Sequence, residues 1–124
     1  MIVLDAGILI AFLDRNDVHF DRALEIMSRS DHAPFVVQPM NLAEALVGPA
    51  RNGRSQEARD DLYRVGVVVA DLGDDEAPIL AEARARHGLK MPDTYALATA
   101  LYEGVRLETF DQCPAKAWER AAAR

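Results

Sequence analysis

Four acidic residues stand where carboxylate chemistry could arise. Asp5 and Asp111 follow short apolar runs, and Glu44 and Asp93 lie near the starts of predicted helices. Gathered carboxylates repel one another, by roughly 4 kcal/mol per pair at about 4 Å and an effective dielectric constant near 20. A divalent cation removes this repulsion, and oxygen ligands without His or Cys favour Mg²⁺ or Mn²⁺. A bound ion of this kind supports phosphodiester hydrolysis, because it activates water and stabilises the leaving oxygen.

Each acidic residue also has a purely structural interpretation. Asp5 would cap the helix that follows it, and Asp93 would complement a helix dipole. Asn41 and Glu44 have the spacing of a capping box, and Asp111 would start a turn. The metal-site hypothesis therefore depends on all four residues lying at compatible positions in the fold.

Hydrophobic patterning predicts an alternation of strands and helices along the whole chain. Strands are predicted at residues 2–4, 35–38, 66–70 and 105–110. Helices are predicted at residues 7–13, 17–30, 41–47, 56–64, 75–87, 92–103 and 114–123. Residues 66–70 are wholly apolar, which is typical of a buried parallel strand. The pattern predicts one α/β domain over residues 1–124, with a parallel sheet covered on both faces.

The predicted topology brings the acids toward one edge of the sheet, where open parallel sheets bind ligands. Asp5 and Asp111 follow the first and last strands, and Glu44 lies in the first turn of the helix after the second. Asp93 is harder to place, because two helices precede the last strand. It reaches the same edge only if helix 75–87 lies across the sheet or the loop 88–91 returns to that edge.

Composition narrows the function classes. Half of the 124 residues are hydrophobic and the net charge is −6, so binding of nucleic acid by bulk positive charge is disfavoured. No apolar run approaches the roughly 18–20 residues of a membrane span. The N-terminus lacks the basic region of a secretory signal, and Cys113 is the single cysteine, which excludes an internal disulfide. We therefore expect a cytoplasmic protein with no membrane contact.

Four segments resemble the PIN-domain ribonucleases, in particular the VapC-type toxins of bacterial toxin–antitoxin pairs. They read IVLDAGILIAFLD, NLAEALVGPAR around Glu44, LKMPDTYALATA around Asp93, and ETFD ending at Asp111. The resemblance implies a PIN-like, three-layer α/β/α fold with a central parallel sheet of four to five strands. It also implies an Mg²⁺-dependent endoribonuclease (or one using Mn²⁺) acting on transfer or ribosomal RNA, a homodimer, and a VapB-type antitoxin.

The resemblance assigns roles to individual residues. Asp5, Glu44, Asp93 and Asp111 match the acidic metal positions, and Thr109 matches a Ser or Thr that supports the site by hydrogen bonding. Two departures stand out. Gly7 replaces a small polar residue, which removes a side-chain hydrogen bond near the metal. No acid follows closely after Asp111, so one metal ion is favoured over two.

Other residues leave alternatives open. Arg51 and Arg54 would contact RNA phosphates or would simply lie on a solvated loop. The three histidines have no metal-ligand spacing and are interpreted as surface residues. Gly7 keeps open a degenerate PIN domain that binds RNA or a protein without cleavage. A receiver-like signalling module, with Asp71 as phosphoacceptor, is disfavoured because it lacks the paired acids after the first strand and a suitably placed lysine.

Overall fold

A computed structural model of the chain describes residues 1–123. Its four strands form one parallel sheet in the order β3-β2-β1-β4. The strands are β1 (Ile2–Leu4), β2 (Phe35–Val37), β3 (Val67–Val69) and β4 (Arg106–Glu108). The helices are α1 (Ala6–Phe12), α2 (Phe20–Met27), α3 (Pro39–Arg51), α4 (Ser55–Arg64), α5 (Glu76–His87), α6 (Met91–Glu103) and α7 (Gln112–Ala122), with 3₁₀ turns η1 (Ser30–His32) and η2 (Gly73–Asp75). The predicted α/β fold is confirmed, with four strands.

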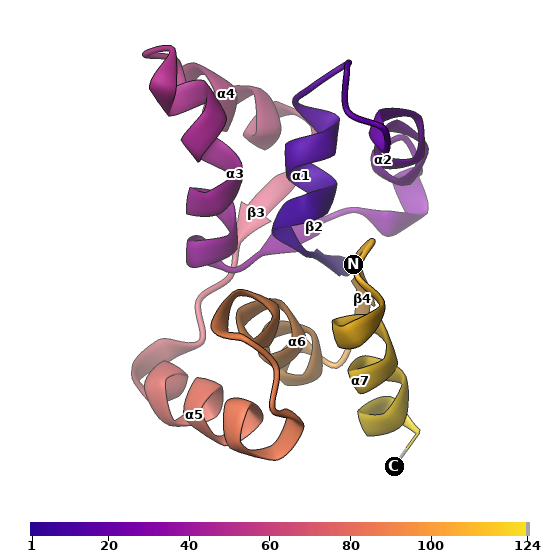
Figure 1. Ribbon diagram of the computed structural model, residues 1–124, viewed down its shortest axis with the longest axis vertical. Helices are drawn as coiled ribbons and strands as arrows, with labels where there is room; N and C mark the ends of the chain where they lie inside the picture. Colours follow the sequence, from indigo (N-terminus) through magenta and orange to yellow (C-terminus); the bar gives the residue numbers. More distant parts are fainter. Residues whose placement is uncertain (124) are drawn as a thin grey trace.

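The sheet separates two helical layers, as Figure 1 shows: α1 to α4 lie on one side and α5 to α7 on the other. Alternate strand residues point to opposite faces, which is the two-residue period of a strand. Ile2 and Leu4 enter the core beneath the first layer, whereas Val3 enters the core beneath the second. The expectation of a sheet covered on both faces is therefore confirmed for its central part.

The edge strand β3 departs from expectation. Its apolar run suggested a strand buried on both faces, but Val68 is 43% and Val69 39% exposed. The strand has a partner on one side only, and α5 packs on α6 and η2 instead of covering it. An apolar run predicts a strand here but does not show whether the strand is central or at the edge.

Helix α3 is longer than predicted at both ends. It begins at Pro39, and Gln38 caps it by accepting a hydrogen bond from the Met40 N–H at 2.6 Å. The predicted end near Gly48 and Pro49 is wrong, because the helix continues to Arg51 with Pro49 inside its last turns. Glu44 accordingly lies in the second turn of α3 and not in the first.

The histidines are not all on the surface. His19 is exposed as predicted, but His32 is buried, which corrects the interpretation of all three as surface residues. The Nδ1 atom of His32 lies 3.0 Å from the carbonyl of Ile26, and its Nε2 lies 3.1 Å from Arg106. A ring with two polar partners can be buried without losing hydrogen bonds.

The α5–α6 hairpin resolves the difficulty with Asp93. Leu72, between β3 and α5, is buried in the second core, so the chain has already crossed to that face of the sheet. Helix α5 then packs on α6, and α6 packs on β1 and β4. This hairpin starts α6 at the carboxyl edge of the sheet. No helix within residues 1–123 is long and apolar enough to cross a membrane.

Candidate metal centre at the carboxyl edge of the sheet

Asp5 is a buried acid with both of its carboxylate oxygens bonded. Its Oδ1 accepts the Ala6 N–H at 2.7 Å, which caps α1, and its Oδ2 accepts the Thr109 hydroxyl at 2.7 Å. The side chain is therefore held in one orientation by the start of α1 and by the segment that follows β4. Each carboxylate oxygen still has a second lone pair, so these bonds leave capacity to bind a cation.

Thr109 connects the two acids at the ends of β1 and β4. Its hydroxyl donates to Asp5 and accepts the backbone N–H of Asp111 at 3.0 Å. Asp111 in turn caps α7, because its Oδ1 accepts the Cys113 N–H at 2.9 Å. The capping role predicted for Asp5 is therefore confirmed, whereas Asp111, predicted to start a turn, caps a helix.

Asn41 links the Glu44 side chain to the segment that carries Asp93. This fully buried residue donates through Nδ2 to Glu44 Oε1 at 3.2 Å and to the Pro92 carbonyl at 3.0 Å. The second bond ties the start of α6, and with it Asp93, to the first turn of α3. Asn41 was expected to be a helix cap; in the structure Gln38 is the cap, and Asn41 positions Glu44.

The acids at this edge carry more negative charge than the surrounding residues neutralise. Burial raises the pKa of Asp93 above its ordinary value, and the charges of Asp5, Asp111 and Glu44 raise it further. Burial is also the main reason that the pKa of Asp5 is raised. The positive charge of Lys90 acts on both residues and lowers the pKa of each. The three other predicted acids therefore lie within electrostatic reach of Asp93.

The four carboxylates are suitable ligands for a hard cation, but their side chains are not arranged as a complete metal site. The four candidate ligands are all carboxylates, with no His or Cys among them, and carboxylates are the ligands that Mg²⁺ and Mn²⁺ prefer. Within residues 1–123, however, no group of three or more His, Cys, Asp or Glu side chains is arranged to hold a metal ion.

A groove of about 610 Å³ adjoins Glu44 and runs between α1, α3 and α4. Its apolar lining includes Ile10, Leu13 and Val47. Its charged lining is mostly acidic: Asp14, Glu44, Glu57 and Asp61, with Arg54.

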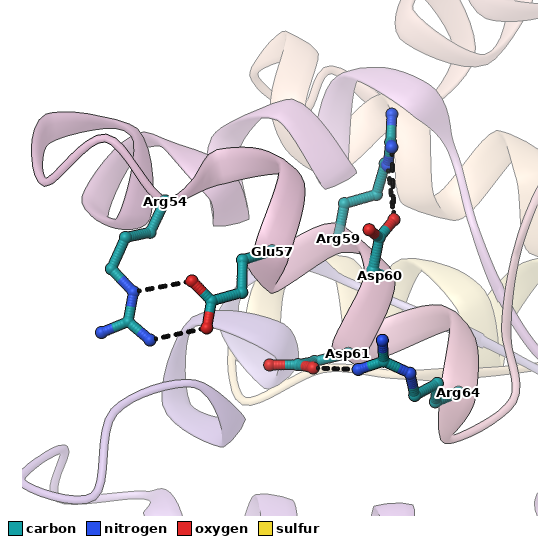
Figure 2. Close-up of polar contacts among 6 residues, drawn as sticks. All are labelled: Arg54, Glu57, Arg59, Asp60, Asp61 and Arg64. Atoms are coloured by element: carbon teal, nitrogen blue, oxygen red, sulfur yellow. Dashed lines mark hydrogen bonds and ion pairs between the residues drawn. The ribbon is translucent and has the colours of Figure 1, made fainter.

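The two arginines predicted near the site lie beside this groove. Arg51 ends α3 and is exposed, with no ion pair or hydrogen bond from its side chain to another residue in 1–123. Arg54 makes a two-point contact with Glu57, at 3.0 and 3.2 Å (Figure 2). Of the two, Arg51 is the one available to a phosphate without breaking an existing pair.

Sequence reasoning missed Lys90 and the bridging role of Asn41. Lys90 precedes α6 by one residue and lies three residues before Asp93. Asn41 stands three residues before Glu44, and that spacing suggested a cap. In both cases the nearness to a candidate acid was visible in the sequence, but the tertiary contact was not.

The arrangement is that of a family with a parallel α/β/α sheet and acids at its carboxyl edge. The model of the PIN domain matches residues 2–117, and the chain therefore belongs to the PIN-domain family. PIN-domain proteins are typically nucleases that depend on a metal. This membership excludes the receiver-like alternative, and the Asp71 side chain simply closes a turn by accepting the Gly73 N–H at 2.8 Å.

Solved structures of toxin–antitoxin proteins have the same fold. Mycobacterium tuberculosis VapC20, a toxin that cleaves the sarcin–ricin loop, is 17% identical over 94% of this chain and 95% of that one, with a TM-score of 0.78. A chain of a Klebsiella pneumoniae toxin–antitoxin complex is 24% identical over 90% and 88%, with a TM-score of 0.71. One from Rickettsia felis VapBC2, bound to a promoter DNA fragment, is 16% identical over 97% and 92%, with a TM-score of 0.66. No curated protein matches the chain.

Proposed function

We propose that this chain is an Mg²⁺- or Mn²⁺-dependent endoribonuclease and the toxin of a type II toxin–antitoxin pair. The observation that supports the proposal is the electrostatic effect of Asp5, Asp111 and Glu44 on Asp93, with the pKa of Asp5 and of Asp93 raised. Perturbed acids that cluster in this way mark functional sites. Family membership and the fold of the toxin structures support the same activity.

The four acids would hold the metal ion, which when bound supplies an activated water and charge stabilisation for phosphodiester hydrolysis. Thr109 keeps the Asp5 carboxylate in place, and Asn41 does the same for Glu44. Lys90 adds a positive charge beside Asp5 and Asp93, where a phosphate group would approach. Each of these residues positions or balances a ligand, so the chain itself needs no nucleophile.

The substrate class in this proposal is a loop of transfer or ribosomal RNA. A protein of net charge −6 attracts RNA weakly at long range, so recognition would depend on shape and a few placed cations. Arg51 and Arg54 would contact phosphates on the Glu44 side of the site. We expect Arg51 to contribute more, because Glu57 competes with RNA for Arg54.

The cognate partner would be a VapB-type antitoxin. Relatives of the same fold are solved in toxin–antitoxin complexes. The groove beside Glu44 suits a peptide with apolar side chains for its walls and basic residues for its acidic lining. A small neighbouring reading frame that begins with a DNA-binding segment would support this partner. A homodimer, implied by the resemblance, stays a prediction that mass measurement in solution would test.

The test is cleavage of mixed transfer and ribosomal RNA with Mg²⁺ or Mn²⁺. Metal assistance is worth several kcal/mol of barrier, so Asp93→Asn should cleave at least about 100-fold more slowly than wild type. Asp60→Asn is the matched control, because it removes an exposed carboxylate that is paired with Arg59 on α4. Its cleavage rate should equal that of wild type.

The possible results separate the alternatives. Equal cleavage by wild type and Asp93→Asn would show that the carboxylates are not the active site. If the wild type binds RNA but cleaves none of many RNAs, the chain is a degenerate PIN domain. Gly7, which replaces a small polar residue near Asp5, is the feature that favours this second function.

A further inference from the structure

A pair of stacked rings adjoins the acidic edge. The imidazole of His19, at the start of α2, lies 4.5 Å from the Phe110 ring, with an angle of 25° between the planes. The stacked pair joins two segments that are far apart in the sequence. The contact brings the loop before α2 against the segment that follows β4.

Phe110 stands between two residues of the candidate site. Its neighbours in sequence are Thr109, which bonds Asp5, and Asp111, which begins α7. Consecutive Cα atoms are about 3.8 Å apart, so the ring pair begins one residue from the acids. Phe110 is also packed against the first core cluster, which fixes its ring. The pair is thus attached to the rigid edge of the sheet.

His19 is exposed, and the stacking on Phe110 is the one side-chain contact recorded for it within residues 1–123. Its side chain makes no capping hydrogen bond, and its ring nitrogens have no hydrogen-bond partner in residues 1–123. Its backbone is fixed, because Asp17 accepts the His19 N–H at 2.8 Å. The preceding residue, Val18, is 89% exposed. A fixed ring with free nitrogens is therefore presented to solvent beside an uncovered apolar side chain.

We propose that the His19–Phe110 pair is a stacking subsite for a nucleobase of single-stranded RNA, next to the phosphate held at the acidic edge. The subsite rests on the proposed ribonuclease function and adds a base-binding residue to it. Unstacked bases of RNA loops bind to aromatic and histidine rings in this way. The free ring nitrogens of His19 can also hydrogen-bond to the edge of a base.

The His19–Phe110 ring pair suits an RNA base better than a segment of a protein partner. A flat ring backed by a second ring matches the face of a base, and stacking tolerates any base. The subsite would also compensate for the low positive charge of the protein, since stacking does not depend on bulk electrostatics. A role in binding a protein partner would leave RNA binding unchanged when His19 is replaced.

The experiment measures binding of short single-stranded RNAs in which one base is replaced by fluorescent 2-aminopurine. Asp93→Asn protein with Mg²⁺ is used so that the RNA is not cut. We expect the fluorescence to be quenched on binding, and His19→Ala to abolish the quenching and weaken affinity roughly 10-fold. His19→Phe keeps a ring and should keep both. Tyr102→Ala, which removes an exposed ring from the far end of α6, should have no effect.

Cleavage by the variants with Asp93 intact separates this subsite from the catalytic proposal. Normal cleavage by wild type with identical binding by His19→Ala and wild type overturns the subsite alone. Quenching that depends on His19, in a protein that cleaves no RNA, supports the subsite and overturns the ribonuclease. A protein that neither binds nor cleaves RNA overturns both. Equal melting temperatures of the variants would confirm that each is folded.

Discussion

Acidic residues lie in two contrasting regions of this molecule. On α4 and the turn before it, three acids are paired with arginines and exposed to solvent. The pairs are Arg54–Glu57 at 3.0 Å, Arg59–Asp60 at 3.2 Å and Arg64–Asp61 at 2.7 Å (Figure 2). At the carboxyl edge of the sheet, Asp5 and Asp93 are buried, and no arginine within residues 1–123 is paired with them. Acidic side chains are therefore paired with arginine in one region and only partly balanced, by Lys90, in the other.

The pKa shifts of the two regions have opposite signs. The hydrogen bonds from Arg54 lower the pKa of Glu57, as expected for a paired carboxylate. Burial raises the pKa of Asp93, and three neighbouring acids raise it further. An exposed pair adds little to stability, whereas a buried group of like charges opposes folding. Residues that lower stability in this way are expected where a ligand compensates for them.

The largest effect expected concerns Asp93→Asn and metal binding. An ion that binds only the folded protein stabilises it by about 2.7 kcal/mol at 100 times its dissociation constant. Wild type should gain this stabilisation from Mn²⁺, and Asp93→Asn should lose most of it, as measured by thermal unfolding. Asp60→Asn, on the paired surface, should behave as wild type. Equal stabilisation of both variants would place the ion elsewhere.

The same variant has the opposite effect when a chelator removes metal. At neutral pH Asp93→Asn should then be more stable than wild type, because it removes one of four repelling charges. The pKa of Asp93 is higher in the folded protein than in the unfolded chain. The Asp93 carboxyl therefore contributes its full stability to wild type below the unfolded-state pKa, and this contribution is lost as pH rises through the folded-state pKa. The difference between the two proteins should therefore shrink as pH falls.

The next effect concerns the bridge made by Thr109. Thr109→Val leaves Asp5 Oδ2 and the Asp111 N–H without their shared partner. Loss of a partner from such groups costs about 2 kcal/mol, and we expect urea unfolding to report a decrease of this size. Cleavage should fall as well. Thr109→Ser retains the hydroxyl and should restore both, whereas failure of serine to restore either would make the methyl group the important part.

A smaller effect is expected at Gly7, where a side chain can be added. A Cβ built on Gly7 would meet no heavy atom within 4 Å, so serine fits without displacement. Gly7→Ser should raise metal affinity several-fold through a new hydroxyl near Asp5, measured by titration with Mn²⁺. Gly7→Ala is the matched control, because it adds a Cβ at the same open position without a hydroxyl. Both changes raise helix propensity by up to about 1 kcal/mol, so only a difference in metal affinity supports the site.

The sequence predicted the order of elements because apolar runs and helical periodicity are local signals. It placed β1 at residues 2–4, as observed, and the predicted helices 75–87 and 92–103 end as observed, before Gly88 and Gly104, both of which adopt the left-handed conformation that ends a helix. It misplaced the end of α3, because a Gly-Pro pair does not break a helix so close to its last turn. Exposure of β3 also escaped prediction, since strand order depends on long-range pairing.

The candidate site was predictable only as a set of positions. Asp5 and Asp111 follow strands, so their edge could be inferred from parallel topology. Asp93 could not be placed, because its location depends on how the α5–α6 hairpin packs and on the bond from Asn41 to Pro92. Lys90 lies three residues before Asp93, so this nearness is visible in the sequence, but its effect on Asp5 is not. The contact of His19 with Phe110 joins segments far apart in sequence and has no local signal.

The smallest effect expected lies on the paired surface, at Arg54. Glu57→Gln removes the partner of this arginine and one negative charge from the groove beside Glu44. We expect an unchanged melting temperature, because the pair is exposed, and an RNA affinity increased by a factor of about two to three with a steeper dependence on salt. Arg54→Gln should weaken RNA binding slightly, and Arg51→Gln more strongly, because Arg51 has no competing acid. Equal affinities for all three variants would make both arginines part of a solvated loop and would confine RNA binding to the acidic edge and its metal.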